Sequence, residues 1–359
     1  TITQSVFVNG GAPLANFTLQ NASLCSNKNV VLVDASSVDF GNLVKLEIYW
    51  DFGNDPTIKT IDNAPQAGRT YSHTYPEFGS PASQNYTVRY VAYSGTNCVN
   101  TLSRTVTLLA TPTLQFSPVT PVCANVGPFQ ITEAQLVNVL PGSGVFSGTG
   151  VDAAGLFTPS VSGAGSFIIR YTYTGNNTCV NYIEQSVAIN PMPGANAGPD
   201  KVVIQGGTVT LTPATNANMP VNYQWTPITG LNNPAQPFVI VSSVTGDVTY
   251  TLTVTSDKGC VSTDQVTVKY LKNPVVPNIF SPNGDGTHDN WDIDFLASYP
   301  GCTVEIYNRY GQLVFKSIGY STPWNGTING KPAAIGTYYY IIDPKNQAKI
   351  MTGYVDIVR

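Results

Sequence analysis

Apolar residues alternate with threonine, serine, asparagine and glutamine along most of the chain. Residues 86–93, 167–173 and 250–254 are clear examples, and each would place every second side chain on one face of an extended segment. Helical periodicity is nearly absent, and 32 glycines and 26 prolines supply turns between the alternating segments. The pattern therefore predicts an all-β chain built from half-buried strands.

A regular repeat organises these strands. Cys98, Cys179 and Cys260 follow one another at equal intervals (179 − 98 = 260 − 179). Each cysteine comes after an alternating segment and a turn, and a second alternating segment and a proline-bearing linker follow it. The interval between these cysteines (179 − 98 = 81 residues) is about twice the length of the longest common solenoid repeats. It therefore indicates tandem β-sandwich domains.

The linkers divide the chain into five parts. Residues 1–11 have the shape of the last strand of a preceding, truncated repeat, so we expect the chain to be a fragment of a longer, processed protein. The next parts are predicted sandwich domains at 12–111, 112–191, 192–272 and 273–359.

The cysteine positions predict two disulfides, each within one repeat. Cys25 precedes an early strand of the first domain and Cys98 follows a late one, while Cys123 and Cys179 have the same relation in the second domain. We therefore expect Cys25–Cys98 and Cys123–Cys179, each contributing about 4 kcal/mol in a chain-entropy treatment. Such widely spaced pairs in a β-rich chain are typical of proteins that fold outside the cytoplasm.

The third domain departs from this cysteine pattern. Ile204 stands where the early cysteine would be, so Cys260 and Cys302 are expected to be either free or joined across the last boundary. No CxxC occurs and only two histidines are present, which excludes zinc-finger and zincin spacings.

Composition narrows the function classes further. Charged residues make up 11% of the chain, against about 25% in an average soluble protein. The net charge is −4 and no basic block occurs, which argues against a nucleic-acid partner. No apolar run approaches the roughly 20 residues of a membrane helix, so no transmembrane segment is predicted.

Motifs in the first and third domains carry a family resemblance. The first domain has WDFGN at 50–54, HTY at 73–75 and YTV at 86–88. This resembles the polycystic-kidney-disease (PKD) fold, with Asn54 where that family usually has aspartate. The third domain resembles the PKD/immunoglobulin-like repeats of Bacteroidota surface proteins, and the second is a looser member. The resemblance implies tandem immunoglobulin-like or PKD-like β-sandwiches.

Two features of these domains invite a catalytic or sugar-binding interpretation. Glu47, Asp51 and Asp55 lie close together in sequence, and paired carboxylates can hydrolyse glycosides. No second acidic element is evident opposite them, so we expect no catalytic residue and no enzyme activity in this chain. Trp50 and Trp225 could stack on sugars, but each lies in an alternating strand where a sandwich core needs one large residue, which favours core packing.

The segment 273–359 has the most specific motifs. They are FSPNGDGTHDNW at 280–291, IYNRYGQLVF at 306–315, WNGT at 324–327 and the strand-like 335–341, followed by a terminal strand ending at Arg359. Residues 308–311 indicate a hairpin turn, and 335–342 has the composition of a buried strand. The segment resembles the gliding motility-associated C-terminal domain, the type B sorting domain of the type IX secretion system.

The loop between residues 281 and 292 is a candidate metal site. Oxygen-bearing side chains recur at nearly alternate positions, which approaches the spacing of a calcium-binding loop. The candidate ligands, for which Ca²⁺ is the expected cofactor, are Ser281, Asn283, Asp285, Asp289 and Asp292. The alternative is a metal-free turn held by hydrogen bonds from Asn and Asp side chains.

The resemblance implies recognition by other proteins. A folded sorting domain would bind the type IX secretion translocon and an outer-membrane β-barrel partner, and would bring the protein through the periplasm to the cell surface or the extracellular space. On family grounds, the candidate contacts are Asn308, Arg309, Gly311 and Arg359.

Two function classes follow from this. The first is the stalk and secretion signal of a large surface adhesin, held at the surface, with gliding as one use. The second is the accessory tail of a secreted polysaccharide hydrolase or peptidase whose catalytic domain lies upstream. Binding of a glycan or surface ligand would be an added activity in either class, and the upstream sequence would distinguish them.

Overall fold

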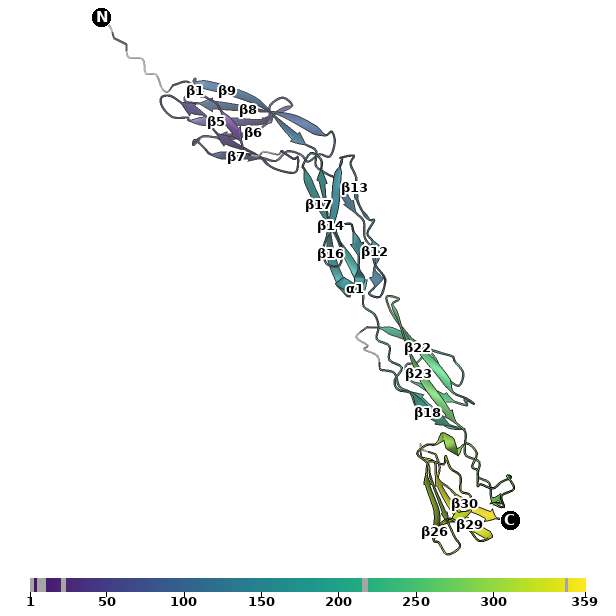
Figure 1. Ribbon diagram of the computed structural model, residues 1–359. Helices are drawn as coiled ribbons and strands as arrows, with labels where there is room; N and C mark the ends of the chain where they lie inside the picture. Colours follow the sequence, from purple (N-terminus) through teal and green to yellow (C-terminus); the bar gives the residue numbers. More distant parts are fainter. Residues whose placement is uncertain (1–2, 5–10, 21–23, 215–218, 346–347) are drawn as a thin grey trace. The chain divides into compact units, whose positions relative to one another are not determined.

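The structure is a computed structural model that describes residues 3–4, 11–20, 24–214, 219–345 and 348–359 (Figure 1). The predicted strand at 1–11 falls mostly outside these residues. The chain forms two compact units, Thr1–Pro191 and Met192–Arg359. In the described residues of both units, strands dominate and the buried side chains form hydrophobic clusters between packed sheets. The prediction of an all-β chain of sandwiches is confirmed, and the four domain boundaries stay predictions.

The first unit begins with a sandwich whose main sheet has the strand order β6-β5-β8-β9 and faces the sheet β2-β3-β7. Trp50 is buried between them, and its Nε1 donates a hydrogen bond to Thr60 Oγ1 at 3.0 Å. The strands are β1 (Pro13–Leu14), β2 (Phe17–Leu19), β3 (Val30–Asp34), β4 (Ser37–Val38), β5 (Lys45–Asp51), β6 (Asp55–Asp62), β7 (Thr70–His73), β8 (Ser83–Tyr93) and β9 (Val99–Leu109).

The second sandwich of this unit has the main sheet β11-β17-β16-β14, opposed by the pairs β10-β13 and β12-β15. Its core is centred on Phe157, Ile169 and Val187, which are fully buried. The elements are β10 (Leu114–Phe116), β11 (Val122–Cys123), β12 (Phe129–Gln130), β13 (Ala134–Leu136), β14 (Gly142–Ser147), β15 (Leu156–Phe157), the single turn α1 (Pro159–Ser162), β16 (Gly165–Gly175) and β17 (Val180–Asn190).

The structure overturns the predicted pairing of Cys25 with Cys98. Cys25 is bonded instead to Cys179, with a Cα–Cα distance of 5.6 Å, and Cys98 is a free thiol. Cys98 lies in the turn before Val99, at the start of β9, whereas Cys25 bridges Leu109 at its end. The two ends of this strand are roughly 33 Å apart, far beyond the reach of a disulfide.

The predicted pair Cys123–Cys179 is wrong for the same reason. Cys123 pairs in register with Asn190 at the end of β17, and Cys179 immediately precedes the start of that strand. Cys123 and Cys260 are both disulfide-bonded. Cys302 is free and buried in the last core, so the alternative of a Cys260–Cys302 bond is also wrong.

The second unit begins with a sandwich made of the sheet β18-β23-β22-β20 and the pair β19-β21. Trp225 is fully buried, and its Nε1 donates to the carbonyl oxygen of Gln236 at 3.2 Å. The strands are β18 (Lys201–Ile204), β19 (Thr208–Leu211), β20 (Val221–Thr226), β21 (Val239–Ser242), β22 (Val248–Ser256) and β23 (Val261–Leu271).

The last sandwich is built on the five-stranded sheet β24-β30-β29-β25-β26. Trp291 and Trp324 fill its core, and the core continues into the preceding sandwich through Leu271 and Ile204. The elements are β24 (Ile279–Phe280), the 3-10 helix η1 (Leu296–Ser298), β25 (Thr303–Tyr307), β26 (Leu313–Ile318), β27 (Thr327–Ile328), β28 (Lys331–Pro332), β29 (Gly336–Asp343) and β30 (Met351–Ile357).

Candidate partner-binding surface

The five-stranded sheet of the last sandwich has one buried and one exposed face. Val304 and Ile306 of β25 and Ile342 of β29 are completely buried against the tryptophans. Because side chains alternate along a strand, their neighbours point to the other face. Tyr339 and Ile341 of β29 are accordingly 52% and 40% exposed. The expectation of a fully buried strand at 335–342 therefore holds for one face only.

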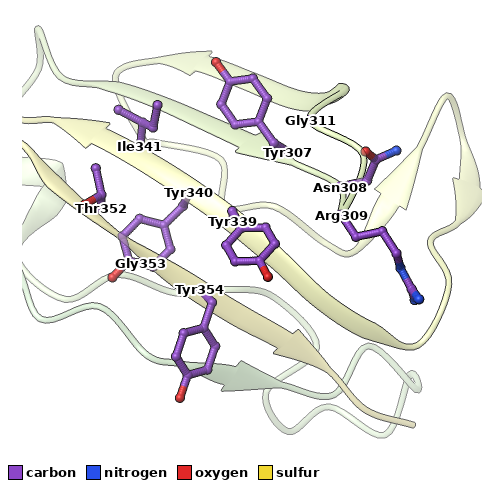
Figure 2. Close-up of a pocket in the computed structure, with 10 residues that line it drawn as sticks. All are labelled: Tyr307, Asn308, Arg309, Gly311, Tyr339, Tyr340, Ile341, Thr352, Gly353 and Tyr354. Carbon is purple, nitrogen blue, oxygen red and sulfur yellow. The ribbon is translucent and has the colours of Figure 1, made fainter.

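Three tyrosines form a row across this exposed face, which we call the tyrosine row. Tyr307 of β25 pairs in register with Tyr339 of β29, and Tyr339 pairs with Tyr354 of β30. Figure 2 shows their rings following one another across the three strands. Directly paired residues on neighbouring strands have Cβ atoms about 5 Å apart, so the three tyrosines are neighbours on this face.

The tyrosine row borders a shallow hollow. Its lining comes from β25, β29, β30 and the hairpin turn that follows β25: Tyr307, Asn308, Arg309, Gly311, Tyr339, Tyr340, Ile341, Thr352, Gly353 and Tyr354. At the row's β25 end, the Tyr307 hydroxyl donates to Glu305 Oε2 at 2.7 Å, and Lys316 forms a 2.8 Å ion pair with Glu305. The hydrogen bond from Lys316 lowers the pKa of Glu305, so this carboxylate stays ionised beside the aromatic surface.

Two of the predicted contact residues shape the hairpin turn. The Asn308 side-chain oxygen accepts hydrogen bonds from the backbone N–H groups of Tyr310 and Gln312, each at 3.0 Å. Gly311 has a φ of +75°, a conformation that side-chain-bearing residues rarely adopt. Asn308 and Gly311 therefore hold the turn that carries Arg309.

Arg309 is the charged residue in the lining of two adjacent hollows. The first is the one beside the tyrosine row, and the second is lined by the same turn and by residues 328 and 332–338. Tyr310 and Ile335 at the second hollow are 80% and 60% exposed. The surface thus combines exposed aromatic and aliphatic groups with a single cation, a composition found at protein–protein interfaces.

Arg359 lies behind the second hollow. Its guanidinium donates to the carbonyl oxygen of Ala333 at 2.9 Å and to that of Pro282 at 3.3 Å. Ala333 lines the second hollow, so Arg359 positions its wall. A direct contact between Arg359 and a partner stays a prediction.

The candidate calcium loop is held by internal hydrogen bonds. The two carboxylate oxygens of Asp289 accept the backbone N–H groups of Gly284 at 2.6 Å and Gly286 at 2.8 Å. Asp285 accepts the backbone N–H of Thr287 at 2.8 Å. Carboxylates in these positions are aimed at N–H donors, not at a common cation centre.

Of the remaining candidate ligands, Asn283 has the same arrangement. The side chain of Asn283 accepts the backbone N–H of Asp285 at 3.0 Å, the backbone N–H of Ser281 donates to His288, and Asp292 is exposed. Among the described residues, no group of three or more His, Cys, Asp or Glu side chains is arranged so that it could hold a metal ion. These hydrogen bonds favour the metal-free alternative, and the choice between the two alternatives stays a prediction.

The three carboxylates of the first sandwich have separate local partners. Glu47 receives the Lys45 ammonium at 2.6 Å, Asp51 receives the Asn54 side chain, and Asp55 receives the Thr57 backbone N–H. They do not form an acid–base pair around a common cleft.

Sequence reasoning predicts the turn but misses the tyrosine row. The composition of 335–342 suggests a strand buried on both faces, whereas one face is open. The signal that could have revealed it is the spacing of Tyr339 and Ile341, opposite in phase to the core residues Tyr338 and Ile342.

In the described part of the chain, no helix has the length and apolar character needed to span a membrane.

Comparison with known families identifies the last sandwich. Residues 275–357 match the CHU_C type IX secretion signal domain. The resemblance of this segment to a type IX sorting domain is thereby confirmed. A type IX secretion signal implies interaction with that secretion system and export to the cell surface or the extracellular space, and the disulfides are consistent with export. The domain itself is non-catalytic.

Similar solved structures are PKD and immunoglobulin domains. The PKD1 domain of Vibrio anguillarum Epp is 22% identical, with 28% of this chain and 98% of that one covered and a TM-score of 0.21. The PKD domain of the KIAA 1837 protein is 25% identical over 22% and 86%, with a TM-score of 0.20. Eight immunoglobulin domains of DSCAM are 10% identical over 97% and 55%, with a TM-score of 0.32. No curated protein matches the chain.

Proposed function

We propose that the last sandwich is recognised in its folded state by the type IX translocon and an outer-membrane β-barrel partner, through the tyrosine row and Arg309. The observation that carries this proposal is the exposed aromatic surface next to the hairpin turn, within a segment that matches a secretion signal. Tyrosine and arginine supply large contact area and directional hydrogen bonds, and they dominate binding energy at many interfaces.

The preceding sandwiches act, in this proposal, as the spacer of a surface adhesin. The Cys25–Cys179 disulfide supports this role because it joins two successive sandwiches covalently. The separated carboxylates of the first sandwich are in keeping with a non-catalytic role. A catalytic domain encoded upstream would instead make this segment the accessory tail of a secreted enzyme, and sequencing the upstream region decides between the two.

Reporter export tests the recognition surface. Residues 192–359 and 273–359 are each fused to a fluorescent reporter behind a Sec signal peptide, in a host with type IX machinery and its matching barrel. We expect surface display from 192–359, and display from 273–359 to the extent that this shorter segment folds. Absence of surface reporter from both fusions, with both present in the periplasm, contradicts the proposal.

Variants of the longer fusion then address the tyrosine row and Arg309. The triple change Tyr339→Ser, Tyr354→Ser and Arg309→Ser should reduce display about tenfold or more, since loss of interface anchors costs over about 1 kcal/mol each. Ile318→Ser is the matched control, because Ile318 is 78% exposed at the far end of the same sheet. Equal display of the triple variant and the control would exclude this surface, provided both melt like the parent.

A further inference from the structure

The three hairpin cysteines occupy one structural position, here called the turn position. In each case the residue five before the cysteine pairs with the residue one after it. The backbone N–H four residues before donates to the carbonyl oxygen of the cysteine, at 3.1, 2.9 and 2.9 Å. The cysteines concerned are Cys98, Cys179 and Cys260. Their equal spacing in the sequence is therefore an equivalence in three dimensions.

A second equivalent position lies at the opposite end of the same sheets, here called the exit position. Leu109, Asn190 and Leu271 end the last strand of each sandwich, and they repeat the interval of the cysteines (190 − 109 = 271 − 190). Each of these three strand-ending residues pairs with one residue of a parallel segment. The residue after that pairing partner donates its backbone N–H to the carbonyl oxygen of the strand-ending residue. The pairing partners, which define the exit position, are Cys25, Cys123 and Ile204.

Within the first unit, an exit cysteine is bonded to the turn cysteine of the next sandwich. Cys25 of the first sandwich joins Cys179 of the second. Polar contacts flank the bond: Asn27 Nδ2 donates to the carbonyl oxygen of Val180 at 3.1 Å, and Asn177 Nδ2 donates to that of Ala110 at 2.8 Å. The bond and these contacts make a junction in which the turn of one sandwich meets the exit of its predecessor.

We propose that Cys98 is the turn half of another such junction, and that its partner is an exit cysteine of a sandwich encoded ahead of residue 12. Cys98 has the backbone register of Cys179, is partly exposed and carries a free thiol. At the other two turn positions, Cys179 and Cys260, the cysteine is disulfide-bonded. Cys302 is not a member of this series, because it is fully buried in the last core.

Formation of this bond is an oxidation of two thiols. Cys98 and the exit cysteine lose two protons and two electrons, and these reduce the disulfide of a thiol-oxidising protein to a dithiol through a mixed disulfide. Such oxidants act where exported proteins fold. The inference goes beyond the proposed role in secretion and does not depend on it.

Peptide mapping of the complete natural protein tests the inference. Trypsin releases residues 90–104, which include Cys98 as their only cysteine. Without reduction, we expect this peptide to be linked to a peptide from the preceding sandwich. By analogy with Cys25, which lies 154 residues before Cys179, the partner cysteine should lie far upstream of Cys98. Recovery of the peptide as a free thiol, as a Cys98–Cys98 dimer of two chains or as an adduct with a small thiol would overturn the proposal.

A cleavage experiment gives a second readout. A specific protease site is inserted just ahead of residue 11 in the complete protein, and the cut products are separated with and without reductant. The fragments should stay joined until reduction, and Cys98→Ser should let them separate without it. Cys179→Ser, which breaks the neighbouring junction, is the matched control and should leave them joined. Fragments that separate without reductant in the parent protein would contradict the proposal.

Discussion

Removing the disulfide between Cys25 and Cys179 should destabilise both sandwiches of the first unit. The bond spans 154 residues, and closing a loop of that size in the unfolded chain corresponds to about 5 kcal/mol in the chain-entropy treatment. If only the second sandwich unfolds, Leu109 still fixes Cys25, and the closed loop runs from Leu109 to Cys179. That shorter loop corresponds to about 4 kcal/mol, so the second sandwich depends on the bond even when the first stays folded.

Differential scanning calorimetry measures this effect. The comparison is between Cys98→Ser and the triple variant with Cys25→Ser and Cys179→Ser added, so that no free Cys98 can exchange with the bond. Measured disulfide contributions are commonly about 2–4 kcal/mol. For sandwiches of this size, such a loss lowers the melting temperature by roughly 10 °C or more. The transitions of the second unit, which lacks these residues, serve as an internal reference.

Two outcomes would refute the reasoning. A triple variant that melts within about 2 °C of Cys98→Ser would show that the junction adds little stability. These measurements use residues 1–359, which do not contain the proposed upstream partner of Cys98. If Cys98→Ser melts far below this unchanged chain, Cys98 contributes to stability in its own right. The pairing of Cys25 with Cys98 inside one sandwich would then have to be reconsidered.

Three further predictions concern single residues or the loop. Gly353→Ala should destabilise the last sandwich by about 1–3 kcal/mol, because a Cβ there would lie 2.5 Å from the Tyr340 hydroxyl. Urea unfolding followed by tryptophan fluorescence measures this loss, and Gly301→Ala, whose Cβ would meet nothing within 4 Å, is the control. The hydrogen bond from Lys45 lowers the pKa of Glu47. The stabilisation that ionised Glu47 contributes is therefore present above the ordinary carboxyl pKa and is lost as pH falls through the lowered pKa. The melting temperature measured from about pH 6 to about pH 3 should fall less steeply for Glu47→Gln than for the unchanged protein. Chelator and excess calcium should both leave the melting temperature of the last sandwich unchanged, and a rise of several degrees with calcium would contradict the metal-free alternative.

Much of the fold could be predicted because alternation and turns are local properties. The hairpin at 308–311 is predictable from its asparagine and glycine, which hold the turn as expected. The position of Ile204 also follows from the repeat alone. In the structure, Ile204 pairs with Leu271 as Cys123 pairs with Asn190. Periodicity transfers such positions from one sandwich to the next without any knowledge of long-range contacts.

The disulfide pairing could not be found in this way. Alternation assigns Cys25 and Cys98 to the same sandwich, but it does not say at which end of the sheet each one lies. The ladder between β8 and β9 extends from Ser83–Leu109 to Tyr93–Val99, and this length separates the two cysteines. The partner of Cys25 belongs to the next repeat, and no pattern within one repeat contains that information.

The last junction shows why the unit of folding is larger than the secretion signal. Leu271, which is only 3% exposed, ends β23 of the third sandwich but packs in the core of the last one, together with Ile204. The Tyr299 hydroxyl also donates to the carbonyl oxygen of Lys272 at 2.9 Å.

These contacts replace the exit cysteine at this junction. A cut at residue 273 removes Leu271 and Lys272 and exposes the buried side chains that they cover. The matched segment at 275–357 is therefore smaller than the core on which its fold depends. Because the tyrosine row lies on a sheet whose inner face is that core, we expect the 273–359 fusion to be displayed less than the 192–359 fusion.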